Sequence, residues 1–159
     1  MTNLFLGNEG AIISDDKNYR YALWRIWDHR LKLIMFIMLN PSTADEKKND
    51  PTIHKCITYA KRWGYGGILI GNLYAFRSTN PLALNFESNP VGPDCDFYLS
   101  EMIKHVDLKI AAWGNNGITK GRTDKVKSLM GKLHYLELSK SGNPKHPLYL
   151  RKTLKPQSF

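Results

Sequence analysis

The chain has 159 residues, of which 42% are hydrophobic, and this fits one globular domain, residues 1–159, with no room for a second. No apolar run reaches the roughly 18 residues that cross a bilayer, and the first ten residues lack the pattern of a signal peptide, so we expect a cytoplasmic protein. The formal net charge is +9, and two cysteines are too few for a disulfide framework or a four-cysteine metal site.

Strand and helix patterns alternate along the chain, which predicts an α/β fold. Residues 19–28 are rich in aromatic side chains and alternate as an amphipathic strand does. With residues 11–14 they predict an N-terminal β-hairpin at an edge of the sheet. Residues 31–39 are almost continuously apolar, as expected of a central strand that is covered on both faces.

A crossover helix is predicted next, because Asp50 suits its N-cap, Pro51 its first position and Gly64 its end. The remaining elements are predicted as a strand at 68–76, a helix at 93–105, a strand at 108–114, a helix at 121–130 and a strand at 133–138. Four strands joined by three helical crossovers predict a three-layer α/β/α fold with a mostly parallel four-stranded sheet, to which the hairpin is added.

Polar residues stand near or beyond the carboxyl end of each predicted strand. They stand at 40–43, at Asn72, at 114–117 and at 142–150. Ligands of open α/β sheets bind beyond the carboxyl ends of the strands, where successive connections diverge. We therefore expect Asn40, Asn72 and His146 to lie in one pocket.

These segments resemble, in the same order, motifs of the uracil-DNA glycosylase superfamily. The resemblance covers about residues 33–152 and indicates an uncharacterised bacterial and phage branch. MLNPST (38–43) is similar to the first motif and nearest to its mismatch-specific form, Gly-Ile-Asn-Pro-Gly. IGNLYAFRSTNP (70–81) resembles the base-reading strand, KIAAWGNNG (109–117) the strand that ends in a glycine turn, and GNPKHPLYL (142–150) the His-Pro-Ser-Pro motif.

The resemblance implies a DNA glycosylase that flips a pyrimidine base out of DNA and removes it by hydrolysis. In that reading Asn40 positions water, His146 stabilises the departing base and Asn72 reads its edge. An amide can accept from the water, but it cannot take up a proton as a carboxylate does. The other substrate-binding residues implied are Pro41, Ser42, Thr43 and Tyr74. Ser42 replaces a tyrosine that bars the thymine methyl group, so 5-substituted pyrimidines become possible substrates.

Positive charge gathers near the C-terminus. Residues 120–155 hold ten Lys and Arg against Asp124 and Glu137, a net of +8. Such a cluster attracts polyanions, and DNA is the expected partner of a monomer, although a solvated basic face would have the same composition. We expect Leu148, Tyr149 or Leu150 to wedge into the gap left by a flipped base, with Leu150 preferred from its spacing in the family. The expected phosphate contacts are Lys145, Arg151 and Lys152.

Structural interpretations remain open beside these. Asn40 can cap a loop, Asn72 can satisfy a turn, and His146 can be a surface histidine between prolines. Residues 45–50 have the pattern of a solvated loop, so no acid-base role is assigned there, and no metal or organic cofactor is expected. Two other functions stay possible: a catalytically silent reader of a modified base or nucleotide, and a phage or host protein that binds RNA or protein.

Overall fold

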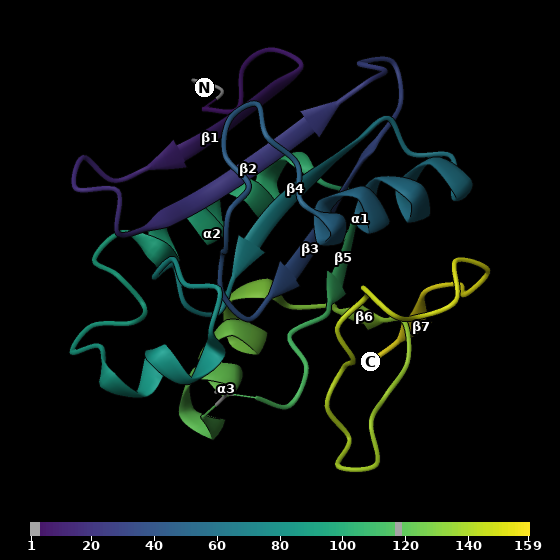
Figure 1. Cartoon of the computed structure of the whole chain (residues 1–159). Helices are drawn as coiled ribbons and strands as arrows, with labels where there is room; N and C mark the ends of the chain where they lie inside the picture. Colours follow the sequence, from purple (N-terminus) through teal and green to yellow (C-terminus); the bar gives the residue numbers. More distant parts are fainter. Residues whose placement is uncertain (1–3, 117–118) are drawn as a thin grey trace.

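The computed structural model describes residues 4–116 and 119–159, and within them the chain forms one seven-stranded sheet (Figure 1). Its order is β1-β2-β4-β3-β5-β6-β7. The strands are β1 (Glu9–Ile13), β2 (Arg20–Ile26), β3 (Leu33–Met38), β4 (Gly67–Asn72), β5 (Leu108–Ala111), β6 (His134–Tyr135) and β7 (Gln157–Ser158). The β4-β3, β3-β5 and β5-β6 pairs are parallel, and the β1-β2, β2-β4 and β6-β7 pairs are antiparallel.

The fold is thus α/β, but the prediction of a four-stranded, mostly parallel sheet is wrong. The four predicted strands appear as β3 to β6 and run parallel, whereas β2 and β7 extend the same sheet with antiparallel pairs. The β1-β2 hairpin exists, but β2 lies inside the sheet and is buried along its whole length. Arg20 and Arg25 made this strand look amphipathic, and periodicity does not reveal which strands pair.

Helices cover both faces of the sheet. They are α1 (Pro51–Arg62), α2 (Cys95–Met102) and α3 (Lys120–Met130), with short 3₁₀ helices η1 (Pro81–Phe86) and η2 (Ile103–His105). The start of α1 is confirmed, since the Asp50 carboxylate accepts from the Ile53 amide at 2.9 Å and Pro51 stands first. The predicted second and third helices are confirmed to within a few residues, and η1 was not predicted. No helix in the described part of the chain is long and apolar enough to cross a membrane.

Two separate apolar cores flank the sheet. Ile53, Cys56 and Tyr59 of α1 pack on one face, and side chains of α2 and α3 pack on the other. The chain leaves β3 through α1 on the first face, and it leaves the neighbouring β5 through α3 on the second face. Connections therefore diverge between the carboxyl ends of β3 and β5, which is where open α/β sheets bind ligands.

Candidate functional site

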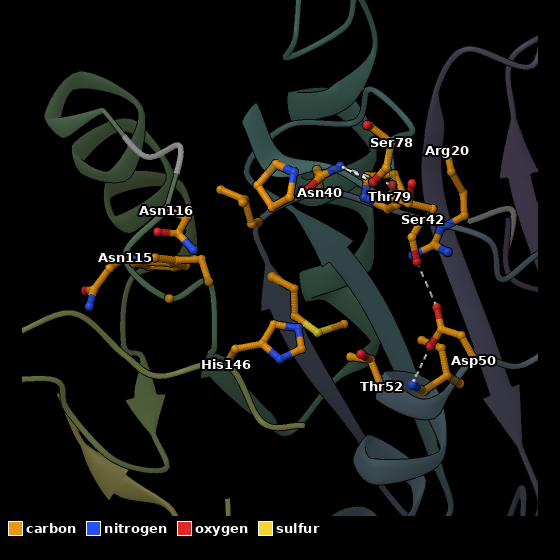
Figure 2. A pocket seen from close by; sticks show the side chains of 17 residues that line it. Arg20, Asn40, Ser42, Asp50, Thr52, Ser78, Thr79, Asn115, Asn116 and His146 are labelled. Atoms are coloured by element: carbon orange, nitrogen blue, oxygen red, sulfur yellow. Dashed lines mark hydrogen bonds between the residues drawn. The ribbon is translucent and has the colours of Figure 1, made fainter. Parts of the chain in front are cut away.

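A cavity of about 260 Å³ opens where these connections diverge (Figure 2). Its lining comes from several parts of the chain: Arg20, residues 38–42, Asp50, Thr52, Ile53, Ser78, Thr79, Pro81, residues 113–116 and His146. Met38, Leu39, Ile53 and Trp113 are buried apolar members of this wall, and most of the others are polar. A floor of buried apolar side chains with polar groups around it suits a flat, polar-edged ligand.

Asn40 holds two loops together at one side of the cavity. Its Nδ2 donates to the carbonyl oxygens of Pro41 (3.2 Å), Phe76 (3.3 Å) and Ser78 (2.9 Å). These three acceptors identify the nitrogen end of the amide, and no group in the described chain donates to Oδ1. The asparagine therefore ties the segment after β3 to the segment after β4, with one acceptor left over.

Asn40→Asp is expected to destabilise the protein by about 2 to 4 kcal/mol, because a carboxylate would face three carbonyl oxygens with no hydrogen to donate. Urea unfolding measures the change. Asn80→Asp is the matched control. The Asn80 oxygen accepts from the Leu82 amide at 3.0 Å, which an aspartate also does, so we expect a change within about 0.5 kcal/mol. Equal effects of the two substitutions would contradict this role of Asn40.

His146 lines the cavity from the opposite side, and its ring is directed toward the cavity (Figure 2). The Leu148 amide donates to its Nδ1 at 3.3 Å, so in the neutral ring the hydrogen lies on Nε2. The residue is exposed at the rim, yet surrounding protein atoms desolvate the ring and lower its pKa, while the Asp50 carboxylate opposes this change. The imidazole is therefore neutral at pH 7, with an Nε2–H donor.

The loop that carries His146 is fixed to the end of β5. The Gly114 amide donates to the Pro144 carbonyl at 2.8 Å, and Gly114 has φ of 74°, a left-handed conformation that favours glycine. The Asn115 oxygen accepts from three polar side chains of the same loop, Ser139, Ser141 and Asn143. The end of β5 thus positions the histidine. Gly117, which the sequence predicts in this turn, lies outside the described residues.

The chain beyond His146 is held against α1. Three side chains spaced four residues apart, two on α1 and one at its C-cap, donate to its carbonyls: Lys55 to Leu150, Tyr59 to Arg151 at 2.6 Å and Trp63 to Leu154 at 3.1 Å. One stripe of the helix therefore orders the C-terminal segment that closes this side of the site.

Asp50 brings a carboxylate into the cavity. Its Oδ1 caps α1, and its Oδ2 accepts from the Ser42 hydroxyl at 3.2 Å. Figure 2 shows Asp50 and His146 on opposite sides of the cavity, with Thr52 between them. Asp50 is the only acidic residue that lines the cavity in the described chain. The interpretation of residues 45–50 as a solvated loop is therefore wrong for Asp50, because folding brings this helix cap beside the end of β3, where it lines the cavity.

Not every predicted residue lies at this cavity. Asn40, Pro41, Ser42 and His146 line it, whereas Thr43, Asn72 and Tyr74 do not. The Tyr74 hydroxyl accepts from the Thr119 amide at 3.2 Å and so contacts the start of α3. Thr43 is exposed outside the cavity.

Asn72 is buried at the end of β4, with 3% of its surface exposed. Its neighbour Gly71 faces α2, so by strand alternation the Asn72 side chain lies on the α1 face, beside the paired residue Met38. Neither end of its amide has a partner within residues 4–116 and 119–159. In this structure Asn72 does not line the cavity, whereas Asn116 is exposed and does.

A second cleft of about 660 Å³ adjoins the cavity and shares four of its residues, 114–116 and His146. Its other members are Glu137, Ser139, Lys145, Tyr149, Leu150 and Arg151. Tyr149 is 93% exposed, whereas Leu150 packs partly against the core on the α1 face. Lys145 forms an ion pair of 2.6 Å with Glu137, which offsets part of its charge. Leu148 and Lys152 lie outside this lining.

Comparison with known proteins gives one family. The family model described as "Protein of unknown function (DUF1643)" matches residues 20–148, which include the strands, loops and His146 that build the cavity. No curated protein and no solved structure matches the chain. The chain belongs to the DUF1643 family.

Proposed function

We propose that the protein is a DNA glycosylase that hydrolyses the N-glycosidic bond of a pyrimidine base flipped out of DNA. The main support for this proposal is that one cavity, at the ends of β3 and β5, has the neutral donor His146 on one side and the carboxylate of Asp50 on the other. The histidine and the carboxylate suit base removal, because negative charge develops on the departing base and positive charge on the sugar.

In the proposed reaction a water oxygen forms a bond to the anomeric carbon as the bond from that carbon to the base nitrogen breaks. The electron pair of the broken bond goes to the base, and the His146 Nε2–H donates to a carbonyl oxygen of this leaving anion. Asp50 accepts a proton from the water. The base then takes a proton from solvent, so the products are the free base and an abasic site.

Asn40 has a secondary part in this scheme. Its Nδ2 is engaged by three carbonyls, so only Oδ1 can contact a ligand or the attacking water. Proton removal then falls to Asp50, which carries the charge that Asn40 lacks. The segment MLNPST (38–43) therefore shapes the cavity, and Asp50 at the start of α1 supplies the carboxylate.

The adjoining cleft is the proposed path of the DNA backbone. Lys145 and Arg151 lie in it, and Lys140 and Lys152 are exposed in the same segment of the chain. Tyr149 is the better placed wedge, because its ring is almost fully exposed while Leu150 contributes to the core. We therefore assign the gap-filling role to Tyr149 in place of Leu150.

Binding to a DNA duplex is expected to weaken about 100-fold between 50 and 200 mM salt, as for a protein that neutralises roughly four phosphates. Arg151→Gln with Lys152→Gln is expected to lower the slope of log affinity against log salt by about 2. Fluorescence anisotropy over a salt series measures both. Affinity that stays flat over this range would contradict a phosphate-binding cleft.

A catalytically silent reader is the second candidate, and the engagement of the Asn40 amide by three carbonyls favours it. Duplexes containing uracil, a thymine mismatch or 5-hydroxymethyluracil separate the two. Alkaline cleavage of abasic sites after incubation shows an enzyme. Base-dependent retention of the duplex without cleavage shows a reader.

A further inference from the structure

Two buried arginines of β2 reach the same loop, residues 42–50. Arg20 is 2% exposed and Arg25 is 5% exposed. Both donate to backbone carbonyls of this loop, Arg20 to Ala44 and Arg25 to Asp45 and Lys48. The two arginines are thus similarly buried, lie on the same strand and bind the same loop.

The protein provides hydrogen-bond acceptors for every side-chain nitrogen of Arg25 but not for those of Arg20. Arg25 uses all three of its nitrogens, with the acceptors Asn49 Oδ1 and the carbonyls of Gly10, Trp24, Asp45 and Lys48. Arg20 has one acceptor, the Ala44 carbonyl at 3.0 Å from Nη1, and its Nε has none in the described chain. Among the same residues no carboxylate forms an ion pair with it. Of the two arginines, only Arg20 lines the cavity.

Arg20 remains a cation in this setting. Burial lowers its pKa to about 10, and Asp50 partly opposes that change, so the guanidinium is protonated at neutral pH. A buried cation is costly unless it is paired and hydrogen-bonded. Figure 2 shows its guanidinium beside Ser42, and hydroxyl groups of Thr52, Ser78 and Thr79 also belong to the lining. The Ser42 and Ser78 hydroxyls already donate, to Asp50 and to the Asn80 carbonyl, whereas the Arg20 Nε is a buried donor without an acceptor in the described chain.

We infer that the Arg20 side of the cavity is a subsite for an oxyanion carried by the ligand, either a carboxylate on the base or the phosphate of a nucleotide. The inference rests on the proposed function only in taking the ligand to be a nucleobase. The planar guanidinium suits both anions because it donates two parallel hydrogen bonds. An uncharged 5-methyl group would leave these donors unpaired, so the subsite selects acidic ligands over thymine.

Calorimetric titration of the purified chain with free ligands tests the subsite without any need for catalysis. One matched pair is 5-carboxyuracil and uracil, and the other is deoxyuridine monophosphate and deoxyuridine. At least one acidic member is expected to bind about 10-fold or more tightly than its neutral partner. Preference in the first pair identifies a carboxylated base, and preference in the second identifies a nucleotide phosphate.

Arg20→Gln is expected to abolish that preference. Arg25→Gln is the control, because it removes an equally buried arginine that reaches the same loop but does not line the cavity, and it should keep the preference. If Arg20→Gln does not fold, Arg20→Lys keeps the charge without the paired donors and should reduce the preference about 10-fold.

Equal affinities within both pairs would overturn the subsite. So would an unchanged preference in the Arg20 variants, or a preference that both arginine variants lose equally. Acid-selective binding without base release from any duplex would refute the glycosylase and leave the subsite standing, so the two failures are distinguishable.

Discussion

His146→Ala is expected to lower the single-turnover rate of base release by about 10²- to 10³-fold while the affinity for DNA changes by less than about twofold. The reason is that the Nε2–H donor strengthens its hydrogen bond only as negative charge develops on the leaving base. Rapid-quench measurement of base release, beside equilibrium binding of the same duplex, separates the two effects.

His54→Ala is the control for this substitution. His54 is exposed on α1 and does not line the cavity, so its loss should change neither the rate nor the affinity. A His146 variant that keeps the full rate, or that loses rate and affinity in equal measure, would make the histidine structural and favour the silent reader.

Asp50→Asn is expected to slow the same step by about 10²- to 10⁴-fold, because the amide cannot take a proton from the water. Stability should change little, since asparagine caps a helix about as well as aspartate and its oxygen can still accept from the Ile53 amide. Single-turnover kinetics give the rate, and thermal unfolding shows whether the cap survives.

Asp45→Asn supplies the matched comparison. The Asp45 carboxylate accepts from the amides of Lys47 and Lys48 within the same loop but does not line the cavity. It should retain the wild-type rate. If Asp50→Asn also retains that rate, Asp50 is a helix cap and no general base.

The parallel centre of the sheet could be predicted because its strands are buried on both faces and read as continuous apolar runs. The N-cap at Asp50 and the boundaries of α1 follow from local chemistry in the same way. The place of β2 could not be predicted, because its pairing with β4 depends on contacts far apart in sequence. Its two arginines read as polar positions, and only the folded loop shows that they are buried.

Part of the cavity lining could also be predicted from the order of the strands. Asn40 and His146 line it together, as expected of polar residues at the ends of parallel strands. Asn72 does not, because it is buried at the end of β4 and its paired residue Met38 lines the cavity in its place. Asp50 and Arg20 were missed, since one reads as a helix cap and the other as a strand residue. A side chain that serves one local role leaves no separate signal for a second.

Release of a free base from DNA tests the central claim most directly. Duplexes that carry a single uracil, mismatched thymine, 5-hydroxymethyluracil or 5-carboxyuracil are incubated with excess protein, and free base is measured by mass spectrometry beside alkali-sensitive abasic sites. We predict that the wild-type chain releases at least one of these bases and leaves an abasic site in equal amount, and that Asp50→Asn and His146→Ala do so far more slowly. Absence of both products from every duplex, under conditions in which the protein binds DNA, would contradict the account.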